Sequence, residues 1–351
     1  MIKDIQIERF RGFQSLNISD FGQFNVIVGE NNSGKSSLLE ALLLMGNPNN
    51  PSLCMLVDGL RDWKQTKDSN DATLLFYKRQ FEIPITLSVD FDTMENREIQ
   101  IHLFQEQINT VNLEIEKKEP ISNLSPLDYG YQIEARVQNE FGIQDLQSRL
   151  TYKRDDKKVQ ITFDPHYGEH LNMHYVASRH LNVSDQGFDK MVEHKEKSIL
   201  INALQLLEPE LKDIVRIDKQ LFVDLGFEQM LPINVLGDGF RTILSLVSLV
   251  YASQGGILLV DEIDNGLHYS SMKAMWKVLF QVAQAYQVQL IATSHNLDSI
   301  RAYNAILETN KDIQDKARIF ALRRLSANQS KAYKYVYEQF NYLLKEEVEL
   351  R

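Results

Sequence analysis

The sequence of 351 residues predicts an α/β fold with buried parallel strands. Three observations lead to this prediction. The apolar run 24–28 is followed by a Gly/Ser/Asn-rich turn and then by an apolar helix pattern. The run 257–260 ends in two adjacent carboxylates, and the run 289–293 ends in Ser-His-Asn. Open α/β sheets bind ligands at the carboxyl ends of such strands.

The turn after the first strand has the full spacing of a phosphate-binding P-loop. Gly29 is followed by four residues and then by Gly34, Lys35 and Ser36. The glycines let backbone N–H groups point at phosphate oxygens, and the helix expected over 35–45 adds its positive N-terminal end. We therefore expect ATP to bind here. The predicted nucleotide-binding residues of the loop are Gly29, Asn31, Asn32, Ser33, Gly34, Lys35, Ser36 and Ser37.

The strand-end residues complete the predicted site. Asp261 and Ser36 are the expected ligands of Mg²⁺, and Lys35 is expected to reach the β- and γ-phosphates. Glu262 is expected to polarise the attacking water. His295, at the tip of the neighbouring strand, can reach a γ-phosphate. The predicted catalytic residues are thus Glu262, Lys35 and His295.

A second glycine turn at 236–241 opens a helix expected over 242–252. The N-terminus of a helix attracts anions. Because one nucleotide already has its own P-loop, we expect this turn to cap the nucleotide of another copy of the chain.

Taken in order, the motifs FRGF at 10–13, GENNSGKSS at 29–37, LGDGFR at 236–241, ILLVDEIDNGLH at 257–268 and ATSHN at 292–296 resemble those of ABC-type ATPase heads. The resemblance is to the RecF, SMC and OLD (overcoming lysogenisation defect) kind, and above all to compact OLD-like ATPases of bacterial anti-phage systems. It implies a P-loop NTPase of ABC-ATPase head type that forms a head-to-tail dimer around two ATP molecules. The single head would span 1–351. Lobe I, approximately 1–180, would hold a mixed sheet and a β-rich segment; lobe II, approximately 181–351, would be α/β and carry the signature helix.

The resemblance also assigns residues. It places Arg11 and Gly12 in the nucleotide site, Gly237, Asp238 and Gly239 in a signature loop that acts in trans, Asp264 in the D-loop, and His295 as the switch histidine. Two departures stand out. The signature has Asp238 near the place of the family's serine, and no Q-loop glutamine is evident. Its positional equivalent is Ser178 or Arg179, and Arg179 either approaches a phosphate or caps a loop.

Between the motifs we expect strands at 83–91, 98–104, 111–115, 131–137 and 159–163, and helical structure over 189–217. Strands at 317–322 and 332–337 and a closing helix are expected near the C-terminus. No apolar heptad persists, so a long coiled coil is not expected. About fifty residues follow His295, too few for the Toprim nuclease domain of OLD nucleases. Any such nuclease is therefore expected on another chain.

Four smaller patterns favour plain structural roles. Asp90 and Asp92 alternate with apolar residues, as on the wet face of a strand. His166, His170 and His174, with Glu169 among them, lack the spacing of a zinc helix. The charges of 153–158 fit a solvated hairpin turn, and Tyr333, Tyr335 and Tyr337 alternate as packed strand residues do.

Composition sets further bounds. The net charge of −10 argues against a chain that coats nucleic acid, although a local DNA-binding groove is compatible with it. The longest apolar runs are shorter than a membrane span, and the N-terminus does not read as a signal peptide, so a cytoplasmic protein is expected. A lone cysteine, Cys54, excludes an internal disulfide.

The main hypothesis is an ATP-hydrolysing sensor or scaffold of an anti-phage system that controls a separate effector. Three alternatives remain open: a RecF-like repair ATPase that clamps DNA, a regulatory ATP-binding scaffold with negligible turnover, and a transporter ATPase.

Overall fold

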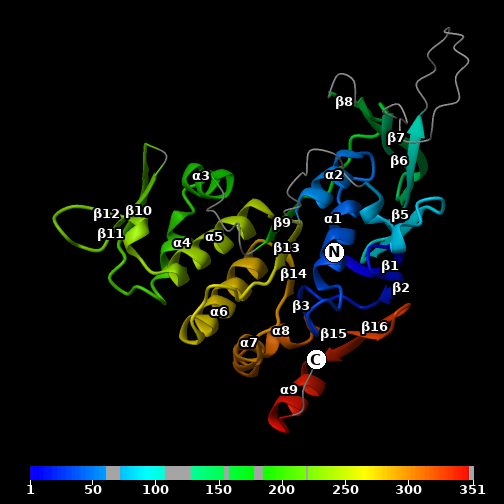
Figure 1. Cartoon of the computed structure of the whole chain (residues 1–351). Helices are drawn as coiled ribbons and strands as arrows, with labels where there is room; N and C mark the ends of the chain where they lie inside the picture. Colours follow the sequence, from blue (N-terminus) through cyan, green and yellow to red (C-terminus); the bar gives the residue numbers. More distant parts are fainter. Residues whose placement is uncertain (61–71, 107–127, 154–157, 178–184, 219, 348–351) are drawn as a thin grey trace, which may run out of the picture.

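The strand that leads into the P-loop lies within a six-stranded sheet (Figure 1). The computed structural model describes residues 1–60, 72–106, 128–153, 158–177, 185–218 and 220–347. The sheet has the order β16-β15-β3-β14-β13-β9. Its strands are β3 (Phe24–Val28), β9 (Met173–Ala177), β13 (Ile257–Asp261), β14 (Gln289–Thr293), β15 (Ala317–Ser326) and β16 (Gln329–Val336). All neighbours are parallel except β15 and β16, so the P-loop, the two carboxylates and His295 follow strands that end at the same edge.

Helices cover both faces of this sheet, as its apolar strands require. Along β3, Phe24, Val26 and Val28 pack into the core that contains α5, α6 and α7, whereas Ile27 packs on the other side with α1. The helices are α1 (Lys35–Met45), α5 (Asp238–Ala252), α6 (Tyr269–Ala285) and α7 (Leu297–Thr309). The predicted P-loop helix is confirmed at both ends. The helix predicted over 242–252 begins four residues earlier, because the glycine turn forms its first turn.

A seven-stranded antiparallel sheet lies beyond α1, in the order β2-β1-β4-β5-β6-β7-β8. Its strands are β1 (Ile2–Phe10), β2 (Phe13–Ile18), β4 (Ile85–Phe91), β5 (Asn96–Glu106), β6 (Asp128–Asn139), β7 (Gly142–Lys153) and β8 (Lys158–Thr162). Helix α1 contacts β1 and β4 on one side and β9, β13 and β14 on the other. The P-loop helix is therefore held between the two sheets.

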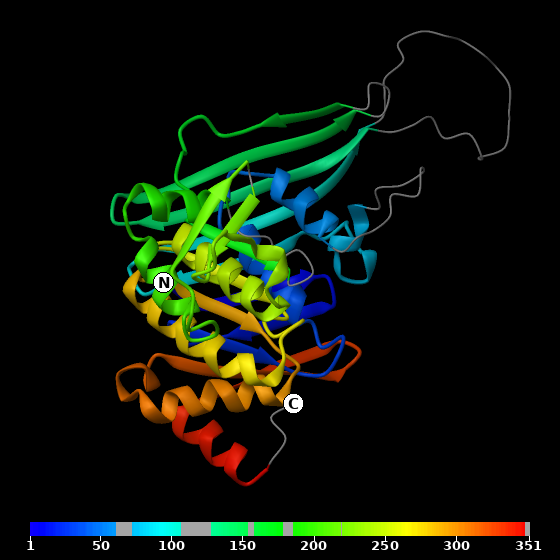
Figure 2. The same ribbon diagram turned by 90° about the vertical axis from the view of Figure 1, so that its left-hand side faces the viewer.

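Figure 2 shows the long strands of the seven-stranded sheet at one end of the molecule and α7 and α9 (Tyr337–Lys345) at the other. Along β4, Leu87, Val89 and Phe91 are buried, which confirms that Asp90 lies on the wet face. Lys153 and Lys158 end the paired strands β7 and β8, as a hairpin requires. Tyr333 and Tyr335 pack against the core, as predicted.

Sequence reasoning missed β1, β2 and β7; the apolar side chains of β7 are too sparse to alternate. It also extended helical structure over 189–217. The structure has α3 (Asp185–Glu193) and α4 (Lys197–Leu204), and then a three-stranded sheet of β10 (Asp213–Ile217), β11 (Gln220–Asp224) and β12 (Leu231–Pro232). Three of the five residues of β10 are β-branched, which suits the strand that its pairing with β11 stabilises. The strand predicted at 111–115 lies outside the described residues.

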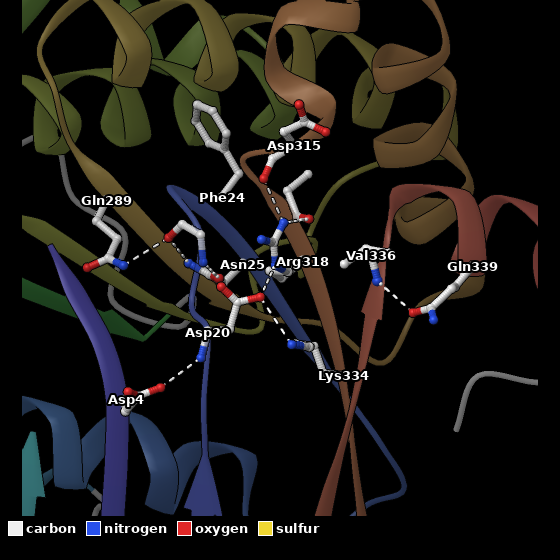
Figure 3. Close-up of polar contacts among 12 residues, drawn as sticks. Asp4, Asp20, Phe24, Asn25, Gln289, Asp315, Arg318, Lys334, Val336 and Gln339 are labelled. Atoms are coloured by element: carbon white, nitrogen blue, oxygen red, sulfur yellow. Dashed lines mark hydrogen bonds and ion pairs between the residues drawn. The ribbon is translucent and has the colours of Figure 1, made fainter. Parts of the chain in front are cut away.

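An ionic contact near the other edge of the six-stranded sheet joins the chain's beginning to its end (Figure 3). Asp20 accepts hydrogen bonds from Arg318 Nε and Lys334 Nζ, both at 3.1 Å, and its backbone N–H donates to Asp4 at 2.8 Å. These bonds connect β1, β15 and β16 through one loop.

Among the described helices, none is both long and apolar enough to cross a membrane.

Candidate nucleotide-binding site

The P-loop backbone adopts conformations that favour glycine. The φ angles are +151° at Gly29 and +102° at Gly34, and Asn32 is also left-handed at +65°. A Cβ on Gly29 would lie 2.4 Å from the carbonyl oxygen of Leu322 in β15. Glycine is therefore needed at position 29 both for its dihedral angle and for its contact with the neighbouring strand.

Two polar side chains of the P-loop, Lys35 and Ser33, lie close to the loop backbone. Lys35 Nζ donates to the carbonyl oxygens of Gly29 and Glu30 at 2.8 and 2.9 Å. Asn31 and Asn32 are exposed, Ser36 is half-buried, and Ser37 is buried. Ser33 Oγ is buried with no hydrogen-bond partner in the described part of the chain. An orphaned hydroxyl beside a helix N-terminus fits a loop built for an anion.

The FRGF motif contacts the P-loop and its helix through two side chains. A Cβ on Gly34 would lie 2.5 Å from Phe13 Cζ, so the Phe13 ring packs on the loop backbone. Arg11 Nε donates to Glu40 of α1 at 3.0 Å, and both side chains are at most 5% exposed. Arg11 also donates to the carbonyl oxygen of Val57. The resemblance assigned Arg11 to the nucleotide, whereas this structure commits its guanidinium to α1 and α2 (Ser52–Gly59). Gly12 lies in the exposed turn between β1 and β2.

The two carboxylates at the end of β13 are positioned by a residue of β14. Thr293, fully buried, donates its hydroxyl hydrogen to Asp261 Oδ1 at 2.6 Å and accepts the Glu262 backbone N–H at 2.7 Å. Tyr175 of β9 lies 3.5 Å from the other Asp261 oxygen. Sequence reasoning missed both roles; the signal available for Thr293 was a hydroxyl residue just before the Ser-His tip.

Glu262 has a left-handed backbone with φ at +53°. This conformation costs a residue with a side chain about 1–2 kcal/mol. The Thr293 hydrogen bond to its N–H helps to hold it. Strain of this kind clusters at functional sites, and here it occurs at the residue predicted to polarise water.

His295 and Asp264 lie near each other beyond these strand ends. His295 is exposed, and it lies close enough to Asp264 to influence the pKa of that carboxyl. Burial raises the pKa of Asp264, and Glu262 adds to the rise, while His295 and the hydrogen bond from Ser294 oppose it. Asp264 is only 4% exposed, and Ser294 Oγ donates to it at 3.2 Å. The resemblance placed Asp264 in the D-loop; in this structure one of its carboxylate oxygens accepts a hydrogen bond from Ser294 of the same chain.

The predicted signature loop forms the N-terminus of α5. Gly237 is its cap, and Asp238 forms an ion pair with Arg241. A Cβ on Gly239 would lie 3.1 Å from Ser271, so this end of α5 sits beside the start of α6, just past the carboxylates. Helices α5 and α1 pack on opposite faces of the six-stranded sheet. The two glycine-rich helix N-termini are thus separated by the sheet.

The donor set fits a magnesium nucleotide. Mg²⁺ typically takes one or two protein oxygens, phosphate oxygens and waters, and Asp261 with Ser36 would supply the protein oxygens. The ion would neutralise charge on the phosphates. No group of three or more His, Cys, Asp or Glu side chains suited to a metal occurs among the described residues, which include His166, His170 and His174. Ser178 and Arg179 lie outside the described residues.

Comparison with known proteins agrees with this geometry. The chain is 25% identical to an "ATP/GTP phosphatase" of Helicobacter pylori, with 92% of this chain and 93% of that protein covered. It is 23% identical to "DNA replication and repair protein RecF" of Rickettsia canadensis, covering 75% and 71%. A solved Smc head, described as bound to the C-winged helix domain of ScpA, matches with a TM-score of 0.50 at 12% identity, covering 97% and 99%.

Fold and site together define a P-loop ATPase with the head fold of the RecF and SMC class. Residues 24–301 match the family model described as "AAA domain, putative AbiEii toxin, Type IV TA system". The chain belongs to this family.

Proposed function

We propose that the chain is an ATP-driven switch of an anti-phage system, which dimerises head to tail around two ATP·Mg²⁺ and controls a separately encoded effector. The observation that carries the proposal is the placement of the two glycine-rich helix N-termini on opposite faces of one sheet. The P-loop helix would hold the triphosphate of its own chain, while the N-terminus of α5 would approach the triphosphate of the partner.

Within one site the residues would divide the work as follows. The P-loop N–H groups and Lys35 would bind the phosphates, and Lys35 would exchange its two backbone carbonyl contacts for phosphate oxygens. Asp261 and Ser36 would hold the metal. Glu262 would orient the attacking water, with its backbone held by Thr293. His295 is exposed at the same edge and would contact the γ-phosphate.

The defence role rests on two supports. The family description names an AbiEii toxin and a Type IV TA system, and the motif order resembles that of OLD-like defence ATPases. A controlled effector would give the ATPase cycle an output, and we propose a toxin-like protein, such as a Toprim-type nuclease, as that effector.

A Glu262→Gln variant tests the proposal, because the amide preserves shape but cannot accept a proton from water. It should bind ATP, remain dimeric by light scattering, and release no phosphate. Tagged and co-expressed with its native neighbouring genes in ATP, it should retain a stoichiometric effector, and Lys35→Ala, prepared identically, should lose it. Wild-type turnover in Glu262→Gln would reject the assigned base. A clean dimer with no bound protein would reject the effector role.

A further inference from the structure

Among the stretches of this acidic chain that contain no Asp or Glu, three carry ten Lys or Arg residues between them. They are 9–19, 76–81 and 316–337. The last segment alone carries six Lys or Arg residues: Lys316, Arg318, Arg323, Arg324, Lys331 and Lys334. With a net charge of −10 for the whole chain, such an uneven distribution marks a local positive surface.

The fold brings the three segments together. Phe10 forms a β-bridge with Phe76, and Arg9 donates to Gln80 at 2.9 Å. Lys78 Nζ in turn donates at 2.8 Å to Asn328, at the tip of the β15–β16 hairpin. Figure 1 shows this hairpin beside β2, which β16 contacts. We call the resulting patch the basic surface, formed by Arg9, Lys78, Arg323, Arg324 and Lys331.

Three cations of these segments are matched with carboxylates: Arg11 with Glu40, and Arg318 and Lys334 with Asp20. Those of the basic surface contact neutral groups instead. Arg9 and Lys78 bond to side-chain amides, and Arg324 donates to the carbonyl oxygen of Ala327 at 3.1 Å.

The hairpin places two of these cations directly opposite each other. Arg323 pairs with Lys331 across β15 and β16, and both lie over the Tyr333 ring, at 5.7 and 4.9 Å from its centroid. Like charges opposite one another weaken a strand pair. Stacking on a shared ring fixes the two side chains without neutralising them. Repulsion between Arg323 and Lys331 lowers the stability of the unbound chain, and a bound anion would offset that repulsion.

The backbone adds a second strained feature. Arg9 and Lys78 both have left-handed φ angles, +59° and +52°. Each conformation costs about 1–2 kcal/mol for a residue with a side chain. Backbone strain of this kind clusters at active sites, ligand clamps and switch regions.

We infer that the basic surface binds the phosphate backbone of a nucleic acid. Its neighbours Gln80, Ser326, Asn328 and Gln329 are amides and hydroxyls, which together with Lys and Arg are the usual phosphate donors. A membrane or a protein interface would call for an apolar centre. Of the β15–β16 tip residues, Leu325 is the large apolar side chain that is exposed, at 48%.

The basic surface also adjoins the ATP site. The carbonyl oxygen of Leu322, one residue before Arg323, lies against Gly29 of the P-loop. A nucleic acid bound to Arg323 and Arg324 therefore contacts β15, the same strand that packs against the phosphate loop. This binding does not depend on the proposed dimer or effector.

The test measures fluorescence anisotropy of labelled duplex DNA, single-stranded DNA and RNA at 50–300 mM salt. With five cations engaged, the wild-type plot of log K against log salt should have a slope of about −4 for the preferred nucleic acid. The variant Arg323→Gln/Arg324→Gln/Lys331→Gln should lower the slope magnitude by about 2 to 3. A matched control, Lys190→Gln/Lys277→Gln/Lys311→Gln, removes the same charge from exposed helix positions and should bind as wild type does.

Three results would overturn the inference: no binding to any of the three probes at 50 mM salt, equal weakening in both triple variants, or binding whose salt slope is unchanged in the hairpin triple. Lys35→Ala, which should lose ATP, should keep the nucleic acid. This arm separates failure of the basic surface from failure of the proposed switch.

Discussion

The Phe13 ring lies where a side chain on Gly34 would have to be, with Cζ 2.5 Å from the position of an added Cβ. Phe13 begins β2, and Gly34 ends the P-loop with φ at +102°. The contact transmits the position of the β1–β2 hairpin directly to the phosphate loop. This relationship gives the FRGF motif a physical role: it supports the P-loop from outside the nucleotide site.

Replacing Phe13 with alanine should therefore damage both stability and nucleotide binding. Phe13 is 1% exposed, and truncating a buried phenylalanine costs about 3–5 kcal/mol. Urea unfolding and titration with a fluorescent ATP analogue measure the two effects. Phe163→Ala, at a phenylalanine that is 50% exposed, is the control and should change neither. Unchanged ATP affinity in folded Phe13→Ala would show that the support has no bearing on binding.

Thr293→Val should reduce turnover with little loss of ATP affinity. Valine keeps the shape of threonine but loses the 2.6 Å bond to Asp261 and the 2.7 Å bond from the Glu262 N–H. Loss of a residue that orients a metal ligand commonly costs 10- to 100-fold in activity or metal affinity. We expect a drop of about that size in kcat and a higher Mg²⁺ requirement.

Thr293→Ser is the matched control, since it retains the hydroxyl and should recover most of the turnover. Magnesium-dependent quenching of a bound fluorescent nucleotide provides a readout separate from catalysis. If valine and serine variants behaved alike in both assays, packing rather than the hydrogen bonds would explain the role of Thr293.

Arg11→Met should destabilise the chain strongly, because the Glu40 carboxyl, 1% exposed, would lose the guanidinium that it pairs with. Removing one partner of a buried pair costs about 3–5 kcal/mol. The double variant Arg11→Met/Glu40→Leu should recover much of that loss, since no buried charge remains. Thermal unfolding of the wild type, both single variants and the double variant completes the cycle. A double variant no more stable than Arg11→Met would mean that the bonds from Arg11 to backbone carbonyls matter more.

The sequence was sufficient where several residues of one motif act on the same ligand. The strand, loop and helix around Lys35 were located correctly, because glycine spacing and strand-helix periodicity depend on local chain geometry. Contacts between distant motifs were not accessible. Nothing near Arg11 indicates Glu40 as its partner, and nothing near Thr293 indicates that its hydroxyl reaches Asp261, 32 positions away. Such pairings are set by the order of strands in the sheet.

The same limit explains the errors at β7 and β10. The first four residues of β7, 142–145, are all exposed, so this half of the strand lacks the alternation of buried and exposed residues that predicts a strand. The five residues of β10 lie at the end of the stretch predicted to be helical. Their extended conformation is set by pairing with β11, which the local sequence does not reveal.

Asp20 should give the wild type an acid-sensitive component of stability. Partial burial raises the pKa of its carboxyl, but hydrogen bonds and charge from Arg318 and Lys334 outweigh burial and leave the pKa below the usual 3.8. Above pH 3.8 the carboxylate is ionised in both folded and unfolded chains, and its contribution is fully present. As the pH falls below 3.8 the unfolded chain takes up the proton first, and the contribution disappears as the pH passes the folded pKa.

Asp20→Asn should therefore be less stable than the wild type at pH 7, and the gap should close as the pH falls from about 4 toward 3. The gap should be small, about 1 kcal/mol or less, because the Asp20 side chain is 41% exposed. Urea unfolding at pH 7, 5, 4 and 3 measures it, with Asp312→Asn in α8 (Lys311–Gln314) as the control at an exposed acid. A gap that stayed constant down to pH 3 would show that Asp20 joins β15 and β16 through shape alone, without its charge.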